Sequence, residues 1–400
     1  MKKPKTWVLT DEKRKIWIEK LEIRPKDLDL AHENWSIRKK SLRGGSCDGV
    51  DLIEIDNGAL SFSVLPTRGM GIWKGNYKGI DLGWNSPIQG PVNPRFVNLQ
   101  DHDGLGWIDG FDELVVRCGL NSNGPPIRDD LINQKGLQNE EKLTLHGKIA
   151  NLPASQVEIM VIPGSPSKLV VKGYVFEPAL ICPKYQLSVQ VSTMAGSNNL
   201  LIEDEVFNMK SVDIELELLY HCNFGPPFLE AGSRLEVAAR EVAPRDNQAA
   251  LGIKNYETYD GPISGFTEQV YWYDLIANQE GKTLVMLNNS LADKAVLIRF
   301  DKRELPTFTQ WKKTASFAEG YVTGLEPATD YPNSKIFERQ CGRVVKLGPG
   351  EKRRSTLSIE VLTNAKAVAA AKTEISQLQH KVERLVHEIP IQKYSDLDNI

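Results

Sequence analysis

The sequence predicts an all-β protein: a large antiparallel sandwich, followed by a C-terminal helix. Between about residues 50 and 362, short runs of alternating apolar and polar residues recur and are separated by turn residues. Strand-then-helix alternation does not recur, which argues against a parallel α/β sheet. Helix-forming residues are concentrated after Ala365, where the strand pattern stops. Together these observations favour one large antiparallel β-sandwich with one helix at its end.

The chain of 400 residues is long enough for two domains, but a large β-sandwich can use this length as one. We expect an N-terminal extension over residues 1–49, the sandwich over 50–362, and a helix with a tail over 363–400. Residues 10–24 mix charge with a few large apolar residues, which is consistent with either a short amphipathic helix or an edge strand.

The first strands of the sandwich are predicted on either side of Asn57 and Gly58. Asn-Gly readily adopts the positive φ angles of a type I′ turn, so a hairpin is expected here. Leu60, Phe62 and Val64 alternate with serines, which predicts one buried and one polar face.

Two irregular stretches follow this hairpin. Residues 66–87 contain closely spaced glycines that are similar to a dinucleotide-binding loop, but turn residues follow where that motif requires a helix. Arg68 in this loop is predicted either to bind a ligand or to clamp a structural carboxylate. Residues 94–135 are rich in Gly, Asp, Asn and Trp and predict a long functional loop.

The C-terminal helix is predicted to cover residues 365–389. Asn364 is expected to cap it and Pro390 to end it. Apolar residues at alternating spacings of three and four form a seam: Ile375, Leu378, Val382, Leu385 and Ile389. This seam is expected to be buried, either on the sandwich or against a second copy of the chain in a homodimer.

The composition excludes several classes of protein. Apolar residues make up 41% of the chain, charged residues 25%, and the net charge is -3, all ordinary for a soluble globular protein. The absence of a basic block argues against a nucleic-acid surface, and no apolar run is long enough to span a membrane. The N-terminus has lysines but lacks the apolar segment of a signal peptide, so a cytoplasmic location is expected.

The five cysteines are scattered and form no C-x-x-C motif, so they suggest neither a disulfide framework nor a zinc site. No H-x-H or H-E-x-x-H spacing supports a metal site either. We therefore expect a protein without a metal or cofactor.

The strand that ends in L-L-Y-H-C-N-F-G-P-P carries the first candidate site residue. His221 has the opposite parity from Leu216 and Leu218, so it points away from their face of the strand. Asn223 and a rigid Gly-Pro-Pro turn follow it. An imidazole at this position is suited to acid–base work in a cleft, although a lone histidine is more often a hydrogen-bonded structural residue.

Three segments share this character, with an ionisable residue near a strand end beside Gly or Pro. They are L-H-G at 145–147, Y-H-C-N-F-G-P-P at 220–227 and G-L-E-P-A-T-D-Y-P at 324–332. In this order the sequence resembles the galactose mutarotase (aldose 1-epimerase) superfamily. More closely it resembles the DUF4432-like branch, which has P-T-R-G-M, L-H-G and G-L-E-P motifs. The resemblance extends over roughly residues 50–362 and implies a galactose mutarotase-like β-supersandwich fold, followed here by the C-terminal α-helix.

The resemblance implies a role for each ionisable residue. Glu326 would be the general base that takes the proton of the anomeric hydroxyl, and His221 the general acid that protonates the ring oxygen. His146 would hydrogen-bond the substrate. The ring opens, the aldehyde rotates, and the ring recloses as the other anomer. This requires an ionised carboxylate and an imidazolium across the sugar ring, but neither metal nor nucleotide.

The expected partner is a monosaccharide or a sugar derivative. Four residues are predicted to contact it: Arg68, Arg117, Asn223 and Trp311. Arg117 matches only loosely the Asn-Arg pair that precedes the first histidine in galactose-specific relatives, and H-G-G of those enzymes is H-G-K here. Trp73 and Trp107 are further candidates for stacking on a sugar face, or are core residues.

Two other functions stay open at this point. A protein of the same fold could bind carbohydrate without turnover. A polysaccharide lyase or hydrolase is the other alternative, and a glycosidase needs a second carboxylate across the cleft. Candidates for that second carboxylate are Glu230, Asp274 and Asp330.

Overall fold

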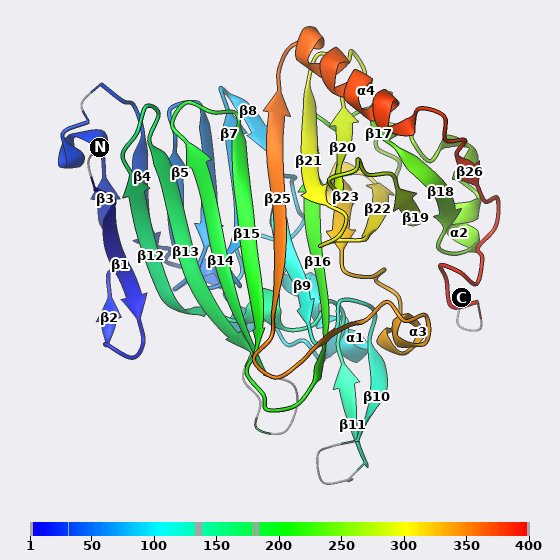
Figure 1. Cartoon of the computed structure of the whole chain (residues 1–400), viewed down its shortest axis with the longest axis horizontal. Helices are drawn as coiled ribbons and strands as arrows, with labels where there is room; N and C mark the ends of the chain where they lie inside the picture. The colour runs from blue at the N-terminus through cyan, green and yellow to red at the C-terminus, as the bar shows by residue number, and fades with distance from the viewer. Residues whose placement is uncertain (1–2, 31, 133–137, 178–179, 181–183, 398–400) are drawn as a thin grey trace.

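The computed structural model describes residues 3–397, except 31, 133–137, 178–179 and 181–183, and shows two large sheets packed face to face (Figure 1). The strands of the first sheet lie in the order β17 (Arg234–Val237), β20 (Lys282–Asn288), β21 (Ala295–Asp301), β25 (Lys352–Leu362), β15 (Asn199–Asn208), β14 (Tyr185–Met194), β13 (Lys168–Glu177), β12 (Ala154–Ile162), β1 (Lys5–Asp11) and β2 (Ile16–Trp17).

The second sheet carries His221 and Glu326, two of the three predicted ionisable residues. Its order is β26 (Leu385–Val386), β18 (Ala239–Pro244), β19 (Gln269–Leu275), β22 (Thr307–Thr314), β23 (Tyr321–Ala328), β16 (Ile214–Phe224), β9 (Val115–Leu120), β7 (Gly71–Tyr77), β6 (Leu60–Leu65), β5 (Asp51–Asp56), β4 (Ser36–Ser41) and β3 (Leu21–Ile23). Two short strands join it at the side: β8 (Ile80–Leu82) pairs with β7, and β24 (Val345–Leu347) pairs with β16.

Few elements lie outside these sheets. β10 (Ile127–Ile132) and β11 (Gln138–Leu143) form a separate hairpin. The α-helices are α1 (Asp101–Gly104), α2 (Asn247–Ala250), α3 (Lys335–Gln340) and α4 (Ala365–Gln379). The large-sheet pairings that are described are antiparallel, apart from β18 with β26. The prediction of an all-β sandwich with a C-terminal helix is therefore confirmed.

The main core lies between the two sheets and follows the period of two in the strands. On β16, Leu216, Leu218 and Tyr220 belong to this core, while Leu219 belongs to a separate cluster on the other face of the second sheet. His221 points to that other face, as its parity predicts.

The N-terminal residues do not form a separate extension. β1 pairs with β12 in the first sheet, and β4 pairs with β5 in the second, so residues within 1–49 continue both sheets. The stretch 10–24 supplies the edge strands β2 and β3 rather than a helix. Residues 94–135 likewise contain β9, an inner strand of the second sheet, in addition to loops.

The hairpin at Asn57 is present, but its turn differs from the prediction. Gly58 has a φ of 94°, whereas Asn57 has no positive φ, so the turn is not type I′. The Asn57 side chain is fully buried and accepts hydrogen bonds from the Ala59 and Leu60 amides.

The C-terminal helix is shorter than predicted. Asn364 caps α4 by accepting from the Ala367 amide, as expected, but the helix ends at Gln379, and Lys381 adopts a left-handed φ of 62°. Ile375 is buried on the sandwich, whereas Leu385 and Ile389 are 54% and 67% exposed. The seam is therefore interrupted by this turn: beyond it, Leu385 joins the second sheet through the backbone of β26, while its side chain and that of Ile389 are exposed.

Candidate functional site

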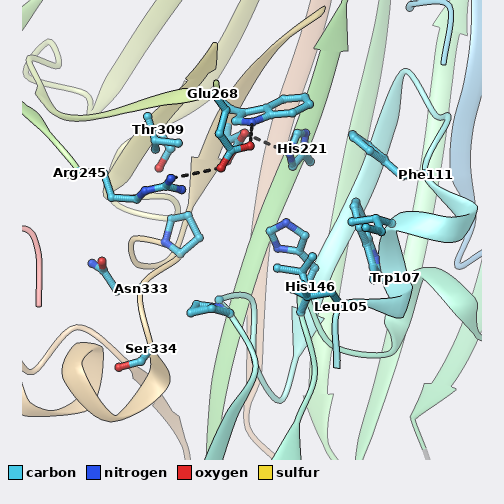
Figure 2. A pocket seen from close by; sticks show the side chains of 18 of the residues that line it. Leu105, Trp107, Phe111, His146, His221, Arg245, Glu268, Thr309, Asn333 and Ser334 are labelled. Carbon is cyan, nitrogen blue, oxygen red and sulfur yellow. Dashed lines mark hydrogen bonds and ion pairs between the residues drawn. The ribbon is translucent and has the colours of Figure 1, made fainter. Parts of the chain in front are cut away.

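A pocket of about 510 Å³ lies on the face of the second sheet that is turned away from the first. Figure 2 shows His146 and His221 between an apolar side with Leu105, Trp107 and Phe111 and a polar side with Arg245, Glu268 and Thr309. The full lining is Leu105, Trp107, Ile108, Phe111, Gly124, Pro125, Leu145, His146, His221, Arg245, Glu268, Val270, Thr309, Trp311, Glu326, Pro332, Asn333, Ser334 and Asp396.

His221 and Glu326 are brought together by strand pairing. β16 and β23 are neighbours, with Cys222 opposite Leu325, so the two side chains lie next to each other on the pocket face. The distance from His221 Nε2 to Glu326 Oε1 is 3.2 Å, and both side chains are almost fully buried. Glu326 Oε1 has no other partner in the described chain, so His221 Nε2 and a bound ligand are the groups left to share its hydrogen bond.

Asn223 fixes the tautomer of His221. Its amide nitrogen donates to the carbonyls of Glu113 and His221, both at 3.0 Å, so its Oδ1 faces the imidazole. His221 Nδ1 lies 2.6 Å from this oxygen and must carry the hydrogen that it donates. Asn223 thus does not line the pocket but orients the histidine that does, and Nε2 is the atom left for chemistry.

Burial determines the resting charges of this pair. Desolvation, with a smaller contribution from the nearby His146, lowers the pKa of His221 to about 3. Desolvation also raises the pKa of Glu326 well above its ordinary value. Both directions favour a neutral pair, in which the single proton resides on Glu326. The sequence-based expectation of a resting imidazolium and carboxylate is therefore not what burial favours.

His146 is held by a strained turn beside the pair. Its φ is 56°, and its Nδ1 lies 2.6 Å from the Asn123 carbonyl, to which it donates. Its Nε2 is then an acceptor, and burial lowers the pKa of His146 to about 4. Gly147 has a φ of 67° and no room for a Cβ, which would lie 2.3 Å from the Gly119 carbonyl oxygen. The glycine of the H-G motif is therefore required, because any side chain at Gly147 would clash with the backbone.

Aromatic rings surround His221. The ring of Trp311 lies 5.3 Å from it, that of Phe111 5.0 Å and that of Trp107 6.3 Å, measured between centroids. Trp73, the other proposed stacking residue, does not line the pocket and donates to Asp112 instead. Phe111 was not predicted, because nothing in its own segment distinguishes it from a core residue.

The polar side of the pocket is a network that the sequence did not suggest. Arg245 Nη2 donates to Glu268 at 3.1 Å, and Arg245 Nε donates to Asp246 at 2.8 Å. Trp311 Nε1 donates to the other oxygen of Glu268 at 2.7 Å. Thr309, opposite Glu326 in the β22–β23 register, has a buried hydroxyl without a partner in the described chain. Only the pairing of distant strands identifies these residues.

Arg68 and Arg117 do not reach the pocket, and their prediction as substrate contacts is wrong. Arg68 is 1% exposed and donates to Glu113 at 2.6 Å and to the Gly110 carbonyl at 2.9 Å. It is the structural clamp that the sequence left as an alternative, and it holds the loop that carries Phe111. Successive side chains on β9 face opposite sides of the sheet, and that of Arg117 is on the side between the two sheets. There it pairs with Asp204 of β15.

The carboxylates proposed as partners of Glu326 also lie elsewhere. Glu230 bonds Ser290, Asp274 bonds Lys302, and Asp330 is fully buried; none of the three lines the pocket. The carboxylates that line the pocket besides Glu326 are Glu268 and Asp396.

The described residues contain no group of three His, Cys, Asp or Glu side chains arranged to hold a metal ion. No helix in the described part of the chain is long and apolar enough to cross a membrane.

Comparison with known proteins identifies the family of this chain. The family model described as "Domain of unknown function (DUF4432)" matches residues 47–361. A protein of Klebsiella pneumoniae, solved as a candidate aldose 1-epimerase, is 34% identical, with a TM-score of 0.92 over 97% of this chain and 99% of that one. A search of curated proteins found no match.

Two more distant structures share the fold alone. A galactose mutarotase-like protein of Clostridium acetobutylicum is 15% identical with a TM-score of 0.54, covering 83% of this chain and 99% of that one. The galactose 1-epimerase of Lactobacillus acidophilus is 12% identical with a TM-score of 0.53, covering 83% of this chain and 100% of that one.

Proposed function

The chain belongs to the DUF4432 family, and from that premise we propose that it interconverts the anomers of a free aldose by acid–base ring opening. One observation carries the proposal: His221 Nε2 and Glu326 Oε1 lie 3.2 Å apart on the wall of a sugar-sized pocket. Two groups that exchange a proton at this distance can take one from a hydroxyl and give one to an ether oxygen.

The reaction balances with a single movable proton in the pair. In the neutral resting pair this proton is on Glu326. Sugar hydroxyls that hydrogen-bond the carboxylate stabilise its charge, so the proton can move to His221 Nε2 before ring opening. Glu326 then accepts the proton of the anomeric hydroxyl while His221 donates to the ring oxygen. The bond from the anomeric carbon to the ring oxygen breaks, and an aldehyde forms.

The reverse steps give the other anomer. The aldehyde rotates about its bond to the next carbon. The hydroxyl group formed from the ring oxygen then attacks the other face of the aldehyde carbon, and both protons return. His146, neutral with a free Nε2, would accept a hydrogen bond from a sugar hydroxyl. The rings of Trp107, Phe111 and Trp311 would cover the apolar face of the sugar.

The charges on the pocket wall favour a neutral aldose. Arg245 is the one side chain among the described lining residues with a permanent positive charge, and Asp246 and Glu268 already pair with it. A uronic acid or a sugar phosphate would bring a negative charge to a wall with no unpaired cation. We therefore propose that the carboxylate of Glu268 and the guanidinium of Arg245 bind sugar hydroxyls instead.

One observation supports a second candidate function, glycoside hydrolysis. Glu326, whose pKa burial raises, and Glu268, which is partly exposed, are two carboxyl groups of different environment on one pocket. Such a pair is the arrangement of an acid and a base or nucleophile in glycosidases. Release of a reducing sugar from aryl glycosides, rather than anomer exchange, would identify this activity.

Saturation-transfer NMR of anomer exchange tests the proposed function on a panel of hexoses, pentoses, 6-deoxy sugars and uronic acids. Glu326→Gln and His221→Asn should each slow exchange about a hundred- to ten-thousand-fold while sugar binding persists. Glu230→Gln, which changes a carboxylate outside the pocket, is the control and should exchange at the wild-type rate. Binding without acceleration for any sugar would favour a carbohydrate-binding protein.

A further inference from the structure

A second pair of carboxyl groups lies behind the site on the same two chain segments. Glu217 precedes His221 by four residues on β16, and Asp330 follows Glu326 by four residues just beyond β23. Both side chains are fully buried, and neither lines the pocket. Buried carboxyl groups are costly, so their place beside the proposed machinery calls for a function.

Asn123 connects this pair to the pocket. Its amide N–H donates to Glu217 Oε2 at 3.1 Å, and its side-chain nitrogen donates to Asp330 Oδ1 at 2.9 Å. Its carbonyl oxygen accepts from His146 Nδ1 at 2.6 Å. The residue that fixes the tautomer of His146 is thus itself held at two points by the two carboxyl groups.

The two carboxyl groups also hold each other. Their side chains are in hydrogen-bonding contact, and Glu217 Oε1 and Asp330 Oδ2 have no other partner in the described chain. Two adjacent buried carboxylates cannot both remain charged, so they share one proton. Consistent with this, burial raises the pKa of Glu217 to about 7 and that of Asp330 well above its ordinary value. Lys335, the nearby cation, donates to the Asn121 carbonyl.

We propose that Glu217 and Asp330 are positioning residues, which hold the Asn123 carbonyl against His146 and so keep its Nε2 available to the sugar. Without this anchor the imidazole could place its hydrogen on Nε2 and would then donate to a sugar hydroxyl rather than accept from it. The kinetic consequence rests on the proposed function, whereas the effect on the tautomer does not.

The test compares variants at Glu217 that keep or remove the acceptor. Glu217→Gln keeps a carbonyl for the Asn123 amide and supplies N–H groups for Asp330, so we expect near wild-type behaviour. Glu217→Leu removes the acceptor at similar size. We expect its kcat/KM to fall about ten- to a hundred-fold, by analogy with the loss of partners that orient a metal-ligating histidine. Asn123→Ala, which loses only the bond to Asp330, should show a smaller loss in the same direction.

The direct readout is the tautomer of His146, followed by ¹⁵N NMR of its ring nitrogens and assigned with His146→Asn. Wild type and Glu217→Gln should show a hydrogen on Nδ1 alone, and Glu217→Leu a mixture of tautomers. Glu177→Leu is the matched control, since Glu177 is another buried carboxyl of raised pKa but bonds the Leu120 amide.

An unchanged His146 tautomer in Glu217→Leu, or a loss of activity no larger than in Glu177→Leu, would overturn the proposal. If the wild-type protein accelerated no anomer exchange, the proposed function would fail while the NMR spectra would still decide the positioning role.

Discussion

Gly324→Ala is the substitution whose effect follows most directly from the geometry of the site. Gly324 lies on β23 between the two proposed catalytic residues, and its φ is not in the left-handed region, so the backbone tolerates alanine. A Cβ at this position would lie 2.5 Å from Glu326 Oε1 and 2.8 Å from His221 Cε1. Both contacts are far inside van der Waals distance, so the methyl group must displace one or both side chains.

The displacement can be estimated from these contacts. Ordinary contact begins near 3.4 Å, so the carboxylate must move by about 3.4 − 2.5 = 0.9 Å. A misplacement of about 1 Å at a reacting group costs on the order of a hundred-fold in rate. Overpacking of this kind costs about 1–3 kcal/mol of stability, which leaves the sandwich folded. We therefore expect kcat to fall about a hundred-fold in a folded protein.

The assay is anomer exchange by NMR, with thermal unfolding recorded on the same samples. Gly261→Ala is the control, because its Cβ would meet only Ala231 at an ordinary 3.6 Å and its φ is likewise permissive. Wild-type exchange by Gly324→Ala would refute the assignment of His221 and Glu326 as the reacting pair. A loss explained entirely by the unfolded fraction would refute the geometric reasoning.

Three further predictions follow from the structure. His146, with a folded pKa of about 4 against an ordinary 6.5, binds its proton more readily in the unfolded chain, so its burial lowers stability as the pH falls through this window. Relative to His146→Asn, the wild type should lose about 3 kcal/mol of unfolding free energy between pH 7.5 and pH 4, measured with urea; equal slopes would contradict this. Arg68→Met leaves the Glu113 charge buried without its partner and should cost about 3–5 kcal/mol with little change in KM for the folded fraction; a rise in KM at unchanged stability would restore Arg68 as a substrate contact. Removing residues from Ile391 onward deletes the Tyr394 carbonyl that accepts from Asn333 on the pocket wall, so sugar affinity and melting temperature should both fall. Isothermal calorimetry and unfolding curves would show neither change if the tail were passive.

Much of the fold could be predicted because period-two alternation reports which face of each strand is buried. Leu216 and Leu218 alternate with Glu215 and Glu217, and this period of two placed His221 on the opposite face. The Asn364 cap was likewise readable, because a helix start depends on neighbouring residues. The end of α4 was not, since the apolar seam continues in the sequence past the turn that the structure places at Lys381.

The candidate site was predicted only in part. The three motifs and their resemblance to a known family indicated His146, His221 and Glu326, which the structure brings to one pocket. The same approach placed Arg68 and Arg117 wrongly. The local sequence around an arginine does not show whether its side chain binds a ligand or, as both do here, a buried carboxylate.

The amino-acid sequence by itself determined many of the strands between residues 50 and 362, the side of those strands that faces the core, and the order of the ionisable residues along the chain. Only the tertiary structure decided which strands lie side by side, and therefore that Thr309 and Glu268 join the site. It also decided the charges, because the pKa of a group depends on the water that neighbouring segments exclude from it. For His221 and Glu326 that exclusion favours a neutral pair with one movable proton, which no local pattern in the sequence records.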